Sequence, residues 1–126
     1  LIIEKMFERK IEIKEVNILI LGITFKENCP DIRNSKVFDL INGFLDLECN
    51  VEVYDPWVNK SSISKKNNIT LIEEPSKNHY DSIVIAVAHD QFKELSIDDF
   101  KAYAKKNHII YDLKYVLSED QVDGRL

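Results

Sequence analysis

Residues 16–23 read VNILILGI and residues 82–88 read SIVIAVA, and almost no polar residue interrupts either run. Strands with one face in water alternate polar and apolar residues, whereas strands covered on both faces are apolar throughout. We therefore expect both segments to be central strands of a sheet that has helices on each of its faces.

Helical and strand-like segments alternate around these two runs. Helices are expected from about Arg33 to Glu48, with Asn34 or Ser35 as the cap, and over Ser96–Lys105, where Ser96 is a typical N-cap. Further expected elements are strands at Val51–Tyr54, Ile69–Ile72 and His108–Tyr111 and a short helix near Asn59–Lys66. The alternation predicts an α/β fold, a Rossmann-like doubly wound parallel sheet of about five strands.

The composition is typical of one folded domain. The chain has 126 residues, of which 44% are hydrophobic and 31% are charged, and this excludes a disordered chain. The formal net charge is -5, so neither nucleic acid nor an anionic membrane is expected as a partner. No apolar run approaches the ~18–20 residues that cross a bilayer. Two cysteines are too few for a disulfide scaffold, so we expect a cytoplasmic location.

Residues 1–15 differ in pattern from the remainder. Acidic and basic residues alternate there around one apolar stripe, which predicts a solvated helix. Because the chain begins with Leu1 rather than Met, we expect it to be a piece of a longer protein. Residues 1–15 are then a helical lead-in, and residues 16–126 form the domain.

The segment with the strongest functional signal is residues 22–34, which follow the first strand. Ligands of doubly wound sheets bind at the carboxyl ends of the strands. This segment is longer than usual for such a loop, and it carries Lys26 and Arg33 near the start of the next helix, a position that favours anions. The two cations either bind phosphate or diphosphate groups or are ordinary surface residues, and their position leaves both readings open.

The usual dinucleotide fingerprint is missing from this loop. Gly22 is followed by Ile23 and Thr24, so no G-x-G-x-x-G motif opens the helix. Asp55 ends the second strand, where such folds place a ribose-binding acid, but without the glycines it is more simply a turn residue. We do not expect a primary NAD-binding domain.

Other side chains at the same edge have structural explanations as good as functional ones. Cys29 has no histidine near it in sequence and is interpreted as a packed or incidental thiol. His89, before Asp90, is either a loop histidine at a helix start or part of a site. Tyr54 and Trp57 either pack at the strand end or stack on a base. The histidines and cysteines lack metal-ligand spacing, so no metal site is expected.

Several motifs stand at the ends of the expected strands, namely ILGITFKEN and PDIRNS within residues 20–35, VYDP at 53–56, AVAHDQF at 86–92 and IYDLK at 110–114. Together they resemble the C-terminal, UDP-binding domain of the UDP-glucose/GDP-mannose dehydrogenase family. ENCPDIRNSK, AVAHDQF and the final VDGRL are most similar to the branch that oxidises UDP-N-acetylhexosamines. The resemblance covers the chain from about residue 16 onward.

The resemblance implies roles for four residues. Phe25 and Lys26 match a pair that contacts the UDP-sugar, and Arg33 matches an arginine that reaches the phosphates of NAD. UDP-glucose dehydrogenases carry Asp-Gly-Arg after the last strand, followed by a basic substrate contact. Here the run is Asp112-Leu113-Lys114, as in the acetamido-sugar branch, and Lys114 is the candidate for that contact.

The resemblance also implies what the whole enzyme does. A double oxidation at C6 of the UDP-sugar, using two NAD+, yields a uronic acid for surface polysaccharides. NAD is bound mainly by an N-terminal domain, and a central region supplies the catalytic cysteine and the homodimer contact. This chain contains neither, so no catalytic residue is expected in it. The alternative is a non-catalytic nucleotide-binding or oligomerisation module with the same fold.

Overall fold

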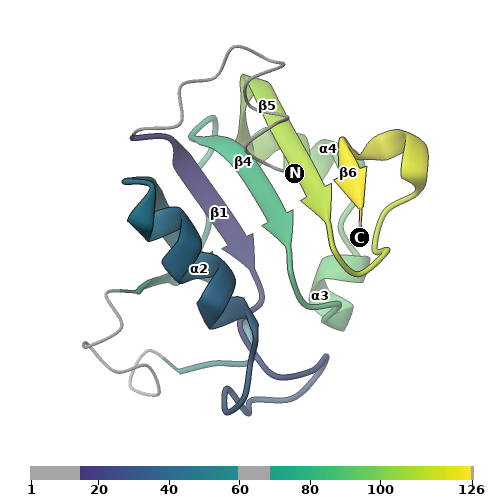
Figure 1. Cartoon of the computed structure of the whole chain (residues 1–126). Helices are drawn as coiled ribbons and strands as arrows, with labels where there is room; N and C mark the ends of the chain where they lie inside the picture. The colour runs from purple at the N-terminus through teal and green to yellow at the C-terminus, as the bar shows by residue number, and fades with distance from the viewer. Residues whose placement is uncertain (1–14, 60–68, 126) are drawn as a thin grey trace.

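The computed structural model describes residues 15–59 and 69–125, and these form one parallel sheet with helices on both faces (Figure 1). The strand order is β3-β2-β1-β4-β5-β6, and every neighbouring pair is parallel. The strands are β1 (Asn17–Leu21), β2 (Asn50–Tyr54), β3 (Thr70–Ile72), β4 (Tyr80–Ile85), β5 (Ala104–Asp112) and β6 (Gly124–Arg125). The predicted doubly wound parallel sheet is confirmed, and the two-residue β6 adds a strand at one edge.

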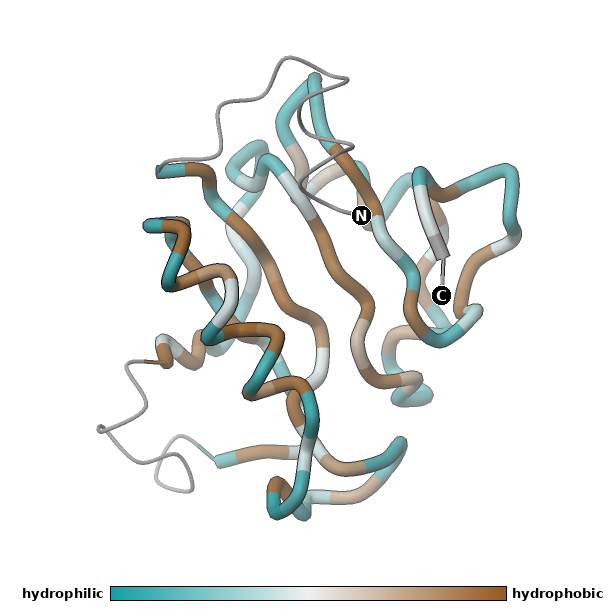
Figure 2. Tube along the Cα trace, in the orientation of Figure 1, coloured by the Kyte–Doolittle hydropathy of each residue, from teal (hydrophilic) through white to brown (hydrophobic). Residues whose placement is uncertain are grey.

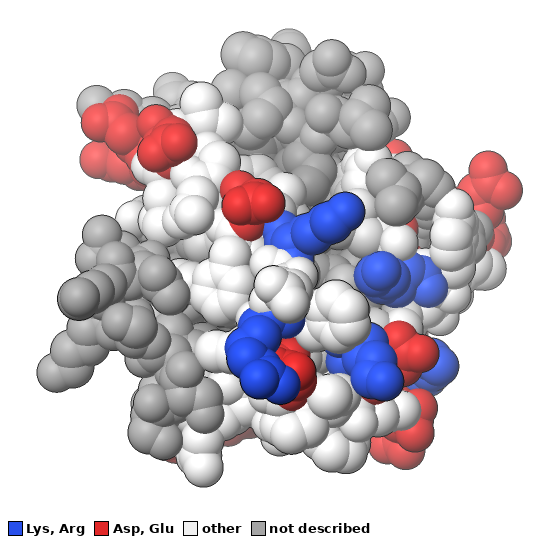
Figure 3. Space-filling model, turned by 60° about the horizontal axis from the view of Figure 1, so that its bottom comes forward, with Lys and Arg blue, Asp and Glu red and all other residues white. Residues whose placement is uncertain are grey.

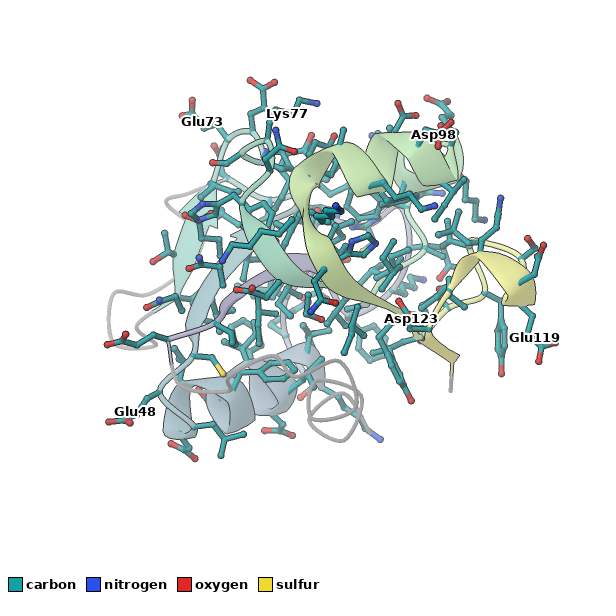
Figure 4. All side chains as sticks on the ribbon, turned by 90° about the horizontal axis from the view of Figure 1, so that it is seen from above. Glu48, Glu73, Lys77, Asp98, Glu119 and Asp123 are labelled. Atoms are coloured by element: carbon teal, nitrogen blue, oxygen red, sulfur yellow. The ribbon has the colours of Figure 1, made fainter. Side chains whose placement is uncertain are left out.

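The helices lie in two layers. They are α2 (Val37–Asp46), α3 (Asp90–Lys93) and α4 (Ile97–Tyr103), and a short 3-10 helix spans Glu119–Gln121. Seen from above, α2 and α4 lie on opposite sides of the sheet (Figure 4). Both faces of the central strands are therefore covered, as their apolar sequences predict.

Alternate residues of β1 contribute to two separate cores. Ile18 and Ile20 pack in one cluster with Ile41 of α2, while Leu19 and Leu21 belong to a second cluster. The second cluster also contains the aromatic side chains of α3 and α4, Phe92 and Phe100. Hydrophobic colour runs along the central strands and α2 (Figure 2). A strand that contributes side chains to both cores buries both of its faces, which explains the apolar run from Ile18 to Leu21.

Helix α2 begins later than the sequence pattern predicts. The expected start near Arg33 is wrong, because Asn34 has a φ of 61° and so cannot belong to a right-handed helix. The N-cap position is held by Lys36, and the Ser35 hydroxyl accepts a hydrogen bond from the Val37 amide at 3.3 Å. Arg33 consequently lies in the loop, and Lys36 stands at the helix start.

The other boundaries differ by smaller amounts. Helix α4 starts as predicted, with Ser96 and Asp99 forming a capping box. It ends before Lys105, because Ala104 is extended and pairs with Tyr80, which makes β5 longer than expected. Helix α3 spans only four residues, too few to produce a helical periodicity in the sequence.

The order of the strands locates the switch point. The chain winds from β1 to β2 and β3 on one side and then returns to β4 on the other side of β1. The loops after β1, β2 and β4 therefore meet at one edge. The predicted lead-in helix and the helix near residues 59–66 fall almost wholly outside the described residues. No helix within the described ranges is long and apolar enough to cross a membrane.

Candidate functional site at the carboxyl edge of the sheet

A buried hydrogen bond between an aspartate and a histidine links the loops that follow β2 and β4. The Asp55 Oδ2 and His89 Nε2 atoms are 3.0 Å apart, and both side chains are fully buried. Asp55 Oδ2 also accepts a hydrogen bond from the Ile23 amide at 2.8 Å, and Asp55 Oδ1 accepts one from the Trp57 amide at 2.8 Å. Asp55 is thus more than a turn residue, because it joins three loops through one carboxylate.

The hydrogen bonds of His89 determine which of its ring nitrogens carries the proton. The Asn28 amide donates to His89 Nδ1 at 2.9 Å, so Nδ1 carries a lone pair. The hydrogen is therefore on Nε2 and points toward Asp55 Oδ2, with Thr24 Oγ1 3.3 Å from the same nitrogen. The Thr24 hydroxyl donates to the Lys26 carbonyl at 2.8 Å. Both ring nitrogens are engaged, so neither is available as a base or a metal ligand.

Above this network lies a pocket of about 240 Å³, on the face that Figure 3 shows with lysine and arginine side chains gathered in blue. Its wall brings together Phe25, Lys26 and Lys114, three of the four predicted binding residues. Phe25 is 57% exposed, an unusual state for a phenylalanine, and its ring is accessible from the pocket rather than packed in the core. The pocket therefore combines an accessible aromatic face with two ammonium groups.

Lys36 also lines the pocket and was missed by the sequence analysis. It stands at the N-terminus of α2, where the helix dipole favours an anion. Its position at the helix terminus follows from the observed start of α2. Because Asn34 is left-handed, the helix starts after Lys36 rather than near Arg33. An adjoining hollow of about 210 Å³ lies over apolar residues of α2, and Lys36 and Lys114 line both hollows.

The loop that carries Lys114 is fixed by a second buried carboxylate. Asp112 is fully buried at the end of β5. Its Oδ1 accepts the Lys114 amide at 3.0 Å, and its Oδ2 accepts the Leu117 amide at 2.8 Å. Both lysine-bearing loops are therefore anchored from below by an aspartate that ends a strand.

Arg33 does not line the pocket. Its Nε donates to Asp31 Oδ1 at 3.0 Å and its Nη2 donates to Asp31 Oδ2 at 3.0 Å, and its side chain is 85% exposed. These hydrogen bonds hold the pKa of Asp31 below its ordinary value and raise the pKa of Arg33. An exposed pair of this kind contributes little to stability, so separating the Arg33 guanidinium from Asp31 costs little free energy.

The turn after β1 does not fit the role of a dinucleotide cradle. Gly22 has a φ of 95°, and a Cβ at this position would lie 2.5 Å from the Cβ of Val87. In a dinucleotide fold the glycines allow the backbone to approach the pyrophosphate. Here the space beside the glycine is filled by a side chain from the β4 loop.

The remaining candidates have packing roles or no ligand set. The Trp57 Nε1 atom donates to Gln91 Oε1 at 3.1 Å, and the Trp57 ring lies 6.1 Å from that of His89. Cys29 is a half-buried free thiol. Among the residues that the structure describes, no group of three histidine, cysteine or acidic side chains is arranged to hold a metal ion.

The doubly wound sheet and the lysine-lined pocket beside its switch point are those of a domain that binds an anionic nucleotide. Residues 19–119 match the model of the UDP-glucose/GDP-mannose dehydrogenase family, UDP binding domain, and the chain belongs to this family.

Relatives with assigned activities are similar over nearly the whole chain. A UDP-N-acetyl-D-glucosamine 6-dehydrogenase of Salmonella typhi is 41% identical and one of Pseudomonas aeruginosa is 40% identical, each over 99% of this chain. These matches cover 29% and 30% of the relatives, so the chain spans less than a third of their length.

Solved structures support the fold. An NDP-N-acetyl-D-galactosaminuronic acid dehydrogenase from Methanosarcina mazei superposes with a TM-score of 0.78 at 22% identity, covering 94% of this chain and 25% of that one. A UDP-D-ManNAc dehydrogenase from Pyrococcus horikoshii gives a TM-score of 0.75 at 24% identity over 99% of this chain and 28% of that one.

Proposed function

We propose that this chain is the UDP-sugar-binding part of an NAD-dependent nucleotide-sugar 6-dehydrogenase that oxidises a UDP-N-acetylhexosamine to its uronic acid. The family of the UDP binding domain and the printed activities of the relatives support the substrate class. The oxidation proceeds in two steps at C6 and serves surface polysaccharide synthesis. It takes place in the cytoplasm, consistent with the two free cysteines.

The observation that carries the proposal is the pocket shared by Phe25, Lys26, Lys36 and Lys114. Ammonium groups bind phosphate oxygens through charge-assisted hydrogen bonds. The three lysines suit the diphosphate of a UDP-sugar, and the exposed ring of Phe25 suits contact with the ribose, base or sugar.

The rest of the reaction belongs to other parts of the protein. NAD supplies the oxidising equivalents, and the closed turn at Gly22 argues that its main site lies outside these residues. Arg33 leaves Asp31 and binds the phosphates of NAD held by the N-terminal domain. The full-length protein is a homodimer, and the catalytic cysteine lies in its central region rather than at Cys29.

The first test is the affinity of the chain for UDP, measured by isothermal titration calorimetry. Removing the ammonium group in Lys26→Ala is expected to weaken binding about tenfold or more, the usual effect of losing one charge-assisted hydrogen bond. Lys101→Ala is the matched control, because Lys101 lies on α4 and does not line the pocket, and its substitution removes the same charge. Equal affinities of the wild type and Lys26→Ala contradict the assignment.

The second test compares the chain with its full-length parent, using NAD and a panel of UDP-sugars. The chain alone is expected to show no NADH formation, and the parent is expected to oxidise a UDP-N-acetylhexosamine. Turnover by the chain alone contradicts the proposed division of roles. UDP binding without oxidation by the parent supports the non-catalytic module instead.

A further inference from the structure

The Asp55–His89 pair lies directly beneath the loop that lines the pocket. Asp55 follows β2 and His89 follows the end of β4, and these strands flank β1 on its two sides. The pair therefore spans the carboxyl end of β1, from which residues 22–36 depart. Full burial of both side chains separates them from solvent and from any ligand in the pocket.

The pair is connected to the loop at two points that bracket the binding residues. Asp55 holds the Ile23 amide before them, and His89 Nδ1 holds the Asn28 amide after them. Phe25 and Lys26 lie between these two anchors. The Lys26 carbonyl is held in addition by the Thr24 hydroxyl at 2.8 Å.

The second anchor supports a left-handed backbone conformation. Asn28 has a φ of 55°, a region that few residues other than glycine and asparagine adopt. Its side chain also accepts the Asp90 amide at 2.9 Å, so the loop is fastened to the start of α3 as well. Such conformations persist where the surroundings impose them. The His89 ring is the buried group that receives the Asn28 amide.

We propose that His89 is a positioning residue for the nucleotide: through Nδ1 it holds residues 25–28 in the shape that lets Phe25 and Lys26 meet a UDP-sugar. The inference rests on the proposed function, since it assigns a role in binding that same ligand. His89 touches no substrate in this arrangement. It acts through the loop, and the Asp55 carboxylate keeps the proton on Nε2 so that Nδ1 stays an acceptor.

Two substitutions separate the roles of the two ring nitrogens. In His89→Asn, the side-chain oxygen takes the place of Nδ1 and accepts the Asn28 amide, while the bond to Asp55 is lost. In His89→Gln, the side-chain amide nitrogen takes the place of Nε2 and donates to Asp55, while Asn28 loses its acceptor. Both variants exchange a buried ring for a smaller amide, and Asn is the smaller by one methylene, so a loss confined to His89→Gln cannot come from lost volume.

The experiment is calorimetric titration of UDP into wild type, His89→Asn and His89→Gln, well below the lowest of their unfolding midpoints. We expect His89→Gln to weaken UDP binding about tenfold and His89→Asn to stay within about threefold of wild type, since one neutral hydrogen bond separates them. Equal losses in both variants, no loss in either, or a larger loss in His89→Asn overturns the proposal. If Lys26→Ala still weakens UDP binding in that case, the proposed function stands without it.

A measurement on the unsubstituted chain covers the case in which a variant does not fold. Nitrogen-15 NMR of the His89 ring at neutral pH is expected to show the proton on Nε2 and a bare Nδ1, with the Nδ1 and Asn28 amide resonances shifting as UDP saturates the site. A proton on Nδ1, or a UDP titration that leaves both resonances in place, overturns the proposal.

Discussion

Three lysines, Lys26, Lys36 and Lys114, line one pocket, and Lys114 is far from the other two in the sequence. Each lysine is positioned by a different structural feature. Lys26 lies on the loop anchored by His89, Lys36 occupies the N-cap position of α2, and Lys114 lies in the turn fixed by Asp112. Like charges brought together repel one another, and Glu27 on the same wall offsets only one of the three, so an arrangement of this kind is stabilised when an anion binds.

Lys36→Met tests this reading at a single residue. Methionine keeps much of the aliphatic stem but removes the charge, so affinity for UDP is expected to fall about tenfold, as for other charge-assisted contacts. Affinity for uridine, which lacks the diphosphate, is expected to change little. Titration of both ligands measures the difference.

Lys101→Met, on α4, is the control for loss of one positive charge from the molecule. A parallel loss for UDP and uridine in Lys36→Met argues against a contact to the diphosphate. It assigns Lys36 a general effect on the shape of the pocket instead.

At the scale of elements, apolar runs predict the central strands well, but the apolar pattern does not locate the start of helix α2. Strands β1 and β4 were predictable because each contributes side chains to both cores, so that most of their residues are buried and apolar. The start of α2 was not, because the left-handed Asn34 is an ordinary residue in sequence and its φ of 61° is imposed by the fold. For the same reason, the sequence did not predict that Lys36 lines the pocket. The contacts of Asp55 and His89 were not predictable either, because they form only where three loops meet.

Replacing glycine with alanine is expected to have opposite effects on stability at Gly22 and at Gly43. Gly22→Ala places a Cβ 2.5 Å from that of Val87 at a φ of 95°. It is therefore expected to destabilise the chain by ~2 kcal/mol or more. Gly43 lies inside α2 with no atom within 4 Å of a Cβ built there. Gly43→Ala is expected to stabilise the chain by ~0.5–1 kcal/mol.

Urea unfolding of the two glycine variants beside the wild type measures both changes. Gly43→Ala serves as the control for the added methyl group. A free energy of unfolding that rises or stays constant in Gly22→Ala contradicts the close approach of the β1 and β4 loops at the switch point.

At the scale of the whole molecule, β1 contributes side chains to both cores, and the two ends of the sheet have different roles. The carboxyl edge carries the pocket and its anchored loops, whereas hydrogen bonds at the amino edge connect strands that are not neighbours. There the Tyr80 hydroxyl donates to Glu52 Oε1 at 2.6 Å and accepts the Ser76 amide at 3.2 Å, which links β4 to β2 across β1. The stability of the amino edge can therefore be probed without touching the site.

Tyr80 makes the global stability depend on alkaline pH. Burial, together with the hydrogen bond to Glu52, raises the pKa of Tyr80 to about 12. An acid whose pKa is raised in the folded state keeps its full contribution below the unfolded value, which is about 10 for tyrosine, and loses it as the pH rises toward the folded value. Between pH 10 and 12 the wild type is therefore expected to lose ~2–3 kcal/mol of unfolding free energy through this group.

Tyr80→Phe removes the titrating hydroxyl together with its two hydrogen bonds. The variant is expected to be less stable than wild type by ~1 kcal/mol or more near neutral pH, because the Glu52 carboxylate and the Ser76 amide each lose a hydrogen bond. Its stability should then fall less steeply between pH 10 and 12, so that the gap narrows as the pH rises. Tyr115→Phe, at a tyrosine that is 59% exposed, is the control. Urea unfolding across this pH range measures all three proteins, and parallel curves for wild type and Tyr80→Phe mean that Tyr80 does not hold the two strands through a protonated hydroxyl.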